Sequence, residues 1–525
     1  MSADRKLHVS LLTIFLLITA ACGTTVPVEQ QELAEVAAAT GEDLGGALPE
    51  GATINEKGQV VSESGEILGD AEDFGIDPGS GSTVTPGNGD TDGVAAAADP
   101  VDPGENGPGV SSTTIKIGIS YADDTEEANA ALGAAEGVGQ INQRQAWEAM
   151  IKYINEHGGA AGRELEPVFH KLSAGSTEPY DQQDQETCAH WTQDDPVFVA
   201  DGAFKTENGI ACFQKNGMVT ITTNGLRFKS GDFFERYPTY LEFDGVDNDA
   251  IDIMYADNMK KLGFFNGDYR LGILSWSDPE YANPTKNTLV PRLQKLGIEV
   301  SDVTYIPVAE SGGEAAGPIA QIGNTAVRYK NDGITHIMAQ DLGGNLAIFF
   351  MAAADRQQYF PRYGLTTASG NTTMANALKG LASEDTARRQ LEDAVSIGFM
   401  PTVDANAEDI PSWGQSTARD ICYKQMREGG VEMADSNAQA LAGGVCDAAW
   451  TIQATLNAIP GEVINQQTWY EALGRVRQMN VELTGGTALN VSPTRRDALE
   501  LAARMKYVDG CVCFRYVSGP FQIPE

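Results

Sequence analysis

The segment 113–170 constrains the fold more than any other part of the chain. Three isoleucines alternate with polar or small residues over Ile115–Ser120, which predicts a strand. From about Gln140 the apolar residues recur at helical spacing, and Gly158-Gly159 ends that helix because glycine adopts a left-handed turn easily. Leu165–His170 predicts a second strand. A strand, a helix and a strand of these lengths indicate a βαβ unit with parallel strands.

Short apolar strands continue to alternate with helices along most of the remaining chain. Strands are expected at Pro196–Ala200 and Met218–Thr222, and a second run of alternation begins at Tyr269–Ser275. Helices follow in the C-terminal part, and Tyr507–Val517 predicts the last strand. This alternation is typical of α/β proteins. We interpret the two runs as two doubly wound lobes with parallel sheets.

The sequence of Ile154–Glu166 resembles the first βαβ unit of type 1 periplasmic binding proteins. The resemblance is carried by the motif Asn-Glu-His-Gly-Gly-Ala-Ala-Gly-Arg. The resemblance is to the branched-chain amino-acid-binding kind, and it runs with gaps from about Thr113 to the C-terminus. It implies a substrate-binding component of an ABC importer, with ABC permease subunits as partners. The implied ligand is a small polar solute (an amino acid, an amide or similar) in the cleft between two lobes.

The resemblance also implies that the lobes are discontinuous and joined by a hinge that the chain crosses three times. Lobe 1 would comprise residues 113–240 and about 403–480, with the C-terminal strand to 525, and lobe 2 would comprise residues 241–402. The implied crossings lie near Pro238–Asp244, Gly398–Val403 and Val481–Thr487.

The N-terminus has the features of a lipoprotein signal peptide over residues 1–22. Arg5 and Lys6 precede an apolar run that is too short to span a bilayer, for which about 20 residues are needed. Small residues directly before Cys22 resemble a bacterial lipobox, although Thr19 stands where such motifs usually have leucine. We expect Cys22 to carry the lipid and to anchor the protein outside the cytoplasm on the cell membrane. The alternative is an ordinary secretory signal.

Residues 23–112 have the composition of a disordered tether. The region is rich in Gly, Pro, Ser and acidic residues, Lys57 is its only basic residue and Phe74 its only aromatic one. Such a segment buries too little apolar surface to offset its chain entropy, and its like charges repel one another.

The six cysteines that remain after Cys22 suit an oxidising compartment. They allow 15 pairings, of which we favour Cys188 with Cys212 and Cys422 with Cys446, because each pair would link two successive elements. Cys511 and Cys513 can pair only if the backbone turns between them; otherwise they are buried thiols.

The net charge and the absence of known catalytic motifs exclude several classes of function. The formal net charge of −37 argues against nucleic acid as a partner, because both would be acidic. The sequence has no serine-hydrolase elbow, zinc-protease motif or phosphate-binding loop, so we expect no enzyme activity, no cofactor and no metal site. The alternatives are a ligand sensor of the same fold, a secreted hydrolase or an envelope scaffold.

The candidate ligand-binding residues follow the expected strands, because ligands of open α/β sheets bind beyond the carboxyl ends of the strands. Hydroxyls and backbone amides there suit a carboxylate or another polar group, aromatic rings suit an apolar side chain, and Asp341 suits an ammonium. The alternative for each residue is a loop side chain packed on its own lobe. The candidates are Ser120, Tyr121, Ala203, Phe204, Thr222 and Thr223 in lobe 1, and Trp276, Tyr281, Asp341 and Thr367 in lobe 2.

Overall fold

The computed structural model describes three short strands between residues 53 and 70 and most of the chain after residue 103. The described ranges are 104–124, 141–202, 206–222, 230–242, 245–341, 344–411, 416–476 and 499–524. The chain divides into two units, Met1–Thr91 and Asp92–Glu525. The expected signal peptide, its Cys22 and the expected third crossing at Val481–Thr487 lie outside the described residues.

The first unit contains a small antiparallel sheet in which β2 (Gln59–Val61) pairs with both β1 (Thr53–Ile54) and β3 (Ile67–Asp70). The expectation of a disordered tether is therefore wrong for these strands. Short β-branched segments such as Gln59–Val61 favour strands locally, a preference that the average composition of the region conceals.

The expected start of the folded part at Thr113 is also wrong, because residues 104–110 already pack against helices of lobe 1 and the loops beside them. The Gly107 N–H donates to the Ile464 carbonyl (2.7 Å), and the Asn465 amide donates to the Glu105 carbonyl (2.9 Å). Glycine is needed at position 107, since a Cβ there would lie 2.9 Å from the Phe198 ring.

Lobe 1 is built on a five-stranded parallel sheet in the order β5-β4-β6-β7-β8. The isoleucines at 115, 117 and 119 are fully buried, so the alternation that predicted the first strand is confirmed. The strands are β4 (Thr114–Ala122), β5 (Glu164–Leu172), β6 (Val199–Asp201), β7 (Val219–Ile221) and β8 (Tyr240–Leu241).

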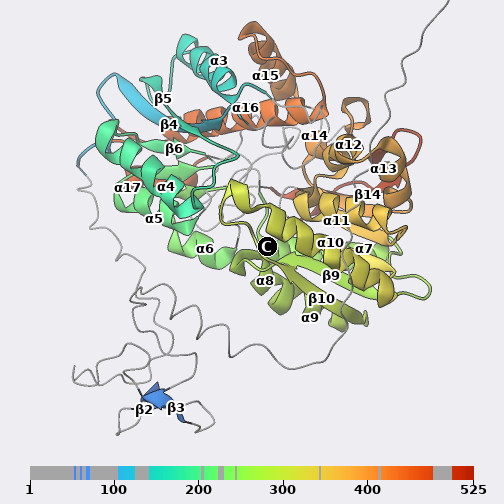
Figure 1. Ribbon diagram of the computed structural model, residues 1–525. Coiled ribbons are helices and arrows are strands. Elements are labelled where there is room, and N and C mark those ends of the chain that lie inside the picture. Colours follow the sequence, from blue (N-terminus) through green and yellow to red (C-terminus); the bar gives the residue numbers. More distant parts are fainter. Residues whose placement is uncertain are drawn as a thin grey trace, which may run out of the picture. The chain divides into compact units, whose positions relative to one another are not determined.

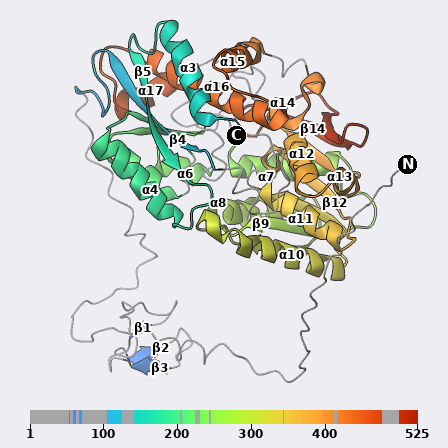
Figure 2. The same ribbon diagram turned by 45° about the horizontal axis from the view of Figure 1, so that its top comes forward.

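Helices from two distant parts of the sequence cover the sheet of lobe 1 (Figure 1). In both ribbon views α3 lies beside α16, and the Gln145 amide of α3 donates to the Gly429 carbonyl just after α15 (Figures 1 and 2). The helices of lobe 1 are α3 (Gln143–Glu156), α4 (Tyr180–Ala189), η2 (His190–Asp194), α5 (Glu207–Lys215), α6 (Gly231–Arg236), α15 (Thr417–Glu428), α16 (Ser436–Asn457) and α17 (Gln466–Leu473).

Helix α3 forms as its sequence predicts. The Asn142 side chain caps it by accepting the Gln145 N–H, and Trp147, Met150 and Ile154 lie on its buried face. The helix ends at His157, where Gly159 takes a φ of 71° and lies so close to the Arg163 carbonyl that a Cβ could not fit.

Lobe 2 is built on a larger mixed sheet in the order β10-β9-β11-β12-β13-β14-β15, with β16 paired to β14. The first five of these are parallel, whereas β14 runs antiparallel to β13. The strands are β9 (Leu271–Trp276), β10 (Val300–Ile306), β11 (His336–Gln340), β12 (Arg362–Thr366), β13 (Val395–Gly398), β14 (Leu501–Val508), β15 (Cys513–Tyr516) and β16 (Phe521–Gln522).

The position of the C-terminal strands corrects the expectation that they belong to lobe 1. Residue Ile397 of β13 pairs with Arg504 of β14, and Tyr507 of β14 pairs with Phe514 of β15. The resemblance alone suggested a return to lobe 1, and strand periodicity does not tell which sheet a strand joins.

The helices of lobe 2 cover the faces of this sheet, and α14 follows β13 where the chain passes toward the lobe 1 helices (Figure 2). They are α7 (Asn248–Lys261), α8 (Pro279–Pro284), η3 (Thr285–Leu289), α9 (Val290–Lys295), η4 (Gly312–Glu314), α10 (Ala316–Asn331), α11 (Asn345–Arg356), η5 (Thr367–Ser369), α12 (Asn371–Leu381), α13 (Glu384–Leu391), α14 (Pro401–Asp404) and η6 (Ala407–Asp409).

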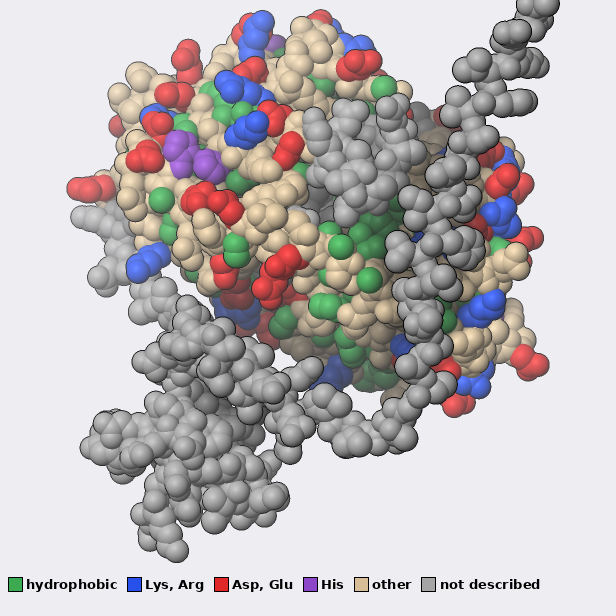
Figure 3. All heavy atoms as spheres, viewed as in Figure 1, with side chains coloured by type: hydrophobic (Ala, Val, Ile, Leu, Met, Phe, Trp, Pro, Cys, Tyr) green, Lys and Arg blue, Asp and Glu red, His purple; other side chains and the backbone are tan. Residues whose placement is uncertain are grey.

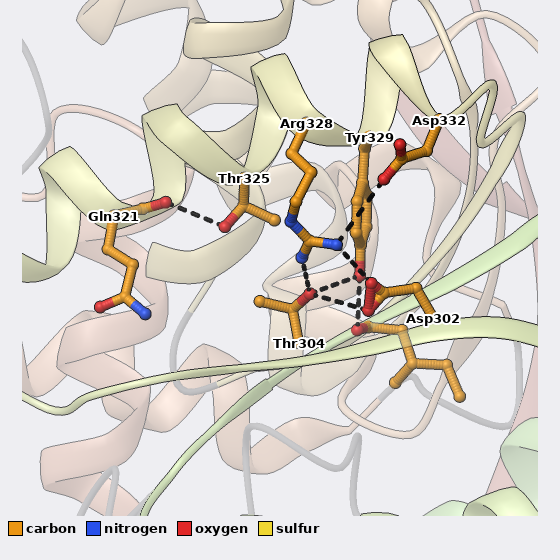
Figure 4. A network of polar contacts seen from close by, with 8 residues as sticks. Asp302, Thr304, Gln321, Thr325, Arg328, Tyr329 and Asp332 are labelled. Atoms are coloured by element: carbon orange, nitrogen blue, oxygen red, sulfur yellow. Dashed lines mark hydrogen bonds and ion pairs between the residues drawn. The ribbon is translucent and has the colours of Figure 1, made fainter. Parts of the chain in front are cut away.

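A polar network fixes α10 on the edge strand β10 (Figure 4). The Arg328 guanidinium contacts both Asp302 and Thr304 of β10. The Tyr329 hydroxyl donates to the Ile273 carbonyl (3.0 Å) and hydrogen-bonds Thr304 (2.9 Å). Because these bonds link one helix to two strands, they hold α10 firmly against β9 and β10.

Disulfides join Cys188 to Cys212 and Cys422 to Cys446, which confirms both favoured pairings. Cys511 and Cys513 are also joined, with their Cα atoms 5.2 Å apart. These two cysteines can pair because the backbone turns between β14 and β15, where Val512 has a φ of 51°.

Acidic side chains are spread over the face of the molecule in Figure 3 with basic ones between them, and no broad basic patch is visible among the described residues on that face. Within the described ranges, no helix combines the length and the apolar character that crossing a membrane requires.

Candidate ligand-binding site

The two lobes touch through segments that follow the carboxyl ends of their strands. The Ser176 carbonyl, after β5 of lobe 1, accepts the Gly313 N–H (2.9 Å), which lies after β10 of lobe 2. The Ser230 N–H, between β7 and α6, donates to the Glu280 carboxylate (3.0 Å) of α8, which follows β9. The edges at which α/β sheets bind ligands are thus turned toward each other.

Three candidates of lobe 1 lie at this edge. Ser120 and Tyr121 are near the end of β4, and Ser120 lies so close to Gly202 that no side chain would fit there. The Tyr121 ring packs edge-on against Phe169, with ring centroids 5.9 Å apart. Thr222 directly follows β7 and is buried. The other three candidates of this lobe, Ala203, Phe204 and Thr223, lie outside the described residues.

Trp276 and Tyr281 of lobe 2 hold buried polar atoms without a hydrogen-bond partner. Trp276 is the last residue of β9, and Tyr281 lies in α8 directly after it. They are 7% and 3% exposed, yet the Trp276 Nε1 and the Tyr281 hydroxyl have no hydrogen-bond partner among the described residues. A buried donor left unpaired is unfavourable by about 1–3 kcal/mol, so pairing these two atoms with a bound group would be favourable.

Burial raises the pKa of the Tyr281 hydroxyl well above its usual value, and nearby carboxylates raise it further. The largest of these charge effects come from Asp278 and Glu242, followed by Asp341. The hydroxyl therefore stays protonated at neutral pH and is available as a donor. It also lies where groups from the ends of β8, β9 and β11 converge.

The side chains of Asp341 and Thr367 already have partners in the protein. The Asp341 carboxylate accepts the N–H groups of Leu346 (3.0 Å) and Ala347 (2.8 Å) in the first turn of α11. The Thr367 hydroxyl donates to Asp404 (3.0 Å) and accepts the Phe399 N–H (2.8 Å). The ligand roles of these two residues stay predictions, and the structure gives both a role in holding loops.

No family model and no curated protein matches this sequence. Solved structures do match. The solute-binding protein of an ABC transporter from Rhodopseudomonas palustris BisB5, in complex with 3,4-dihydroxybenzoic acid, is 16% identical over 78% of this chain and 98% of its own, with a TM-score of 0.54. A branched-chain amino-acid ABC transporter protein from Thermus thermophilus with bound valine is 14% identical over 78% and 97%, with a TM-score of 0.54.

A fatty acid ABC transporter substrate-binding protein from Thermomonospora curvata is 16% identical over 80% of this chain and 97% of its own, with a TM-score of 0.53. The fold is that of type 1 periplasmic binding proteins. The expected resemblance and the expected fold class of two α/β lobes are thereby confirmed, while identities this low leave the ligand open.

The periplasmic binding fold brings further residues to this edge that the sequence reasoning missed. Ser311 follows β10 and Ser369 follows β12, and the buried hydroxyl oxygens of both lack a partner within the described part of the chain. Glu280 links the lobes through Ser230, and its carboxylate lies 3.9 Å from the Arg236 guanidinium. The rule that selected the other candidates, position after a strand, would have found both serines.

Burial raises the pKa of the Glu280 carboxyl, while its bonds to Ser230 and the charge of Arg236 act in the opposite direction. Elsewhere in the described ranges, Asp409, Cys511 and Cys513 form the one group of potential metal ligands. Its two sulfur atoms are joined in a disulfide, which leaves a single carboxylate to bind an ion.

Proposed function

We propose that the protein is the extracytoplasmic solute-binding component of an ABC importer and holds a small polar solute between its two lobes. The observation that carries this proposal is the pair of unpartnered donors, Trp276 and Tyr281, at the edge where the two sheets face each other. Solved structures of the same fold, described as ABC transporter solute-binding proteins, support it. Hinge closure around a ligand needs no covalent chemistry, so the proposal includes no enzyme activity.

The chemistry of these groups indicates what part of the solute lobe 2 recognises. An indole N–H can only donate, and the Tyr281 hydroxyl remains protonated. Both therefore suit acceptor oxygens of a carboxylate, carbonyl or hydroxyl group. The Asp341 carboxylate, which would suit an ammonium, is engaged with the N-terminus of α11. We infer a solute that presents acceptor oxygens to lobe 2, which mass spectrometry of molecules that co-purify with the protein would identify.

Removing either donor should weaken solute binding, and Tyr281→Phe should do so without weakening the fold. Trp276→Phe and Tyr281→Phe each delete one donor and keep an aromatic ring. Each should raise the Kd of the co-purified solute about two- to tenfold, the effect of one net hydrogen bond. For Tyr281→Phe the free energy of unfolding should stay the same or rise, because the deleted hydroxyl has no hydrogen-bond partner among the described residues. Trp276→Phe also removes buried ring volume and should lower it by about 1–3 kcal/mol. Titration calorimetry and denaturant unfolding measure the two quantities.

Tyr329→Phe provides the matched control for this experiment. Its hydroxyl is buried but bonds to Ile273 and Thr304 within lobe 2. That variant should lose stability by about 1 kcal/mol while it binds the solute normally. If both site variants bind like the wild type, Trp276 and Tyr281 do not contact the solute.

We further propose that the mature protein is anchored to the membrane through a lipid on Cys22. Replacement Cys22→Ser removes the thiol that would carry the lipid. The variant should move from the membrane fraction to the soluble fraction of cells, as immunoblotting would show. Retention in the membrane fraction would exclude Cys22 as the anchor.

A further inference from the structure

The two lobes also meet at a place that the hinge does not require. In lobe 1 the sheet ends on one side with β8, which leads toward the first crossing, and on the other side with β5. In lobe 2 the parallel strands run from β13, which leads into the second crossing at α14, to β10 at the opposite edge. Strands β5 and β10 are thus the edge strands farthest in sheet order from these two crossings.

Segments that follow these two edge strands are joined directly by backbone hydrogen bonds. The Gly313 N–H donates to the Ser176 carbonyl (2.9 Å), and the Tyr180 N–H donates to the Glu310 carbonyl (2.7 Å). Residues 176–180 and 310–313 are referred to below as the clasp. Because these bonds join the lobes at the edges farthest in sheet order from the two crossings, rotating the lobes apart about the crossings would break them.

The clasp is closely packed as well as hydrogen-bonded. A Cβ at Gly313 would lie 2.7 Å from the Thr177 Cγ2, so a side chain at this position would force Thr177 to shift while the lobes touch. The backbone of Gly313 does not need glycine for its own conformation, since its φ is not in the left-handed region. It is the contact with the other lobe that favours glycine at this position.

Both halves of the clasp are held rigidly by their own lobes. Glu310–Gly313 connects β10 to α10, and these two elements are tied together by Arg328 and Tyr329 (Figure 4). On the lobe 1 side, the Gln183 amide of α4 donates to the Glu178 carbonyl (2.8 Å). Bonds within each lobe reduce the conformational entropy that the two halves lose when they meet, so less of the free energy of the clasp is offset.

We propose that the clasp holds the two lobes closed and thereby slows the escape of the bound solute. The proposal rests on the proposed solute-binding function for its effect on the solute, but closure itself is measurable without a ligand. A bond that forms only in the closed state shifts the population toward that state by its own free energy. Losing one such bond should speed solute dissociation about three- to tenfold.

A cysteine pair tests whether the lobes meet here in solution. The Cβ position of Gly313 is 3.4 Å from the Thr177 Cβ, near the spacing of about 3.5–4.5 Å found in disulfides. The double variant Thr177→Cys with Gly313→Cys, made in the Cys22→Ser chain, should form a disulfide on mild oxidation. Thr177→Cys with Gly317→Cys is the matched control, because a Cβ at Gly317 has no neighbour within 4 Å.

Compared with an alanine substitution, a proline substitution at Tyr180 removes one bond of the clasp. Tyr180 is the first residue of α4, where proline is well tolerated, and Pro179 already has the extended backbone that precedes a proline. Tyr180→Pro deletes the cross-lobe donor, and Tyr180→Ala deletes the same side chain but keeps the N–H. Relative to Tyr180→Ala, the proline variant should show a larger radius of gyration in X-ray scattering and three- to tenfold faster dissociation of the co-purified solute.

The clasp is supported if the 177/313 pair cross-links, the 177/317 pair does not, and Tyr180→Pro opens the protein relative to Tyr180→Ala. It is overturned if the 177/313 pair stays reduced in folded protein, or if the proline and alanine variants have the same radius of gyration and dissociation rate. Failure to bind any solute in the wild type would instead refute the proposed function, while cross-linking and scattering would still decide on the clasp.

Discussion

Replacing Asp404 with alanine should lower the free energy of unfolding by about 3–5 kcal/mol, the range for breaking a buried polar network. Asp404 is fully buried in α14, where the chain leaves lobe 2. Its carboxylate accepts hydrogen bonds from the Asn371 amide, the Tyr516 hydroxyl (2.9 Å) and the Met400 N–H (2.9 Å), besides the Thr367 hydroxyl. Alanine would leave these buried donors without an acceptor, and denaturant unfolding would measure the loss.

The contribution of Asp404 to stability should depend on pH. Burial raises the pKa of this carboxyl to about 7, although its hydrogen bonds to Asn371, Tyr516 and the Met400 N–H favour the ionised form. The folded state therefore binds a proton more tightly than the unfolded state, whose pKa is near 3.8. The stabilisation is complete below about pH 4 and is lost as the pH rises through about 7, at up to 1.4 kcal/mol per pH unit.

Asp404→Asn removes the titration while it keeps one acceptor oxygen. The wild type should lose stability relative to this variant as the pH rises from 4 to 7, because only the wild-type carboxyl titrates. Asp409→Ala is the control, because Asp409 forms a partly exposed ion pair with Arg515 (3.0 Å) that contributes less than about 1 kcal/mol. A difference that does not change over this pH range would show that the native pKa of Asp404 is not raised.

The fold could be predicted from sequence because its signals are local. The alternation in Ile115–Ser120, the helical face of Trp147 and the paired glycines each act through neighbouring residues, and the structure confirms them. The position of β14 could not be predicted in this way. Its pairing with β13 joins residues about a hundred positions apart in the sequence. The alternation of residues that predicts a strand does not indicate which sheet that strand joins.

The sequence predicts where candidate ligand-binding residues lie along the chain, but it does not show what their side chains contact. Position after a strand selected Trp276 and Tyr281, and the structure gives both buried donors without partners. The same rule selected Asp341 as an ammonium ligand, yet this carboxylate caps a helix. The sequence indicates which residues follow a strand. The hydrogen-bond partner of each such side chain depends on the conformation of the loop that it lies in.

Replacing Asp341 with alanine should lower the free energy of unfolding by about 2–4 kcal/mol. The residue is buried and accepts two N–H groups at the positive end of α11, so alanine would leave both unpaired and remove a favourable interaction with the helix dipole. Asp435→Ala is the matched control. Asp435 caps α16 of lobe 1 through the Ala438 N–H (2.9 Å) and is only partly buried, so its loss should lower stability by about 1 kcal/mol.

Asp341→Asn separates the capping role from the ligand role first predicted for this residue. The amide oxygen can still accept one helix N–H, but the negative charge is gone. If Asp341 acts as a cap, the variant should lose part of the stability that alanine loses and should bind the co-purified solute within about twofold of the wild type, by calorimetry. A Kd raised more than about tenfold in a variant that folds normally would instead show that the carboxylate contacts a cationic group of the solute. That result would also overturn the inference that lobe 2 recognises acceptor oxygens alone.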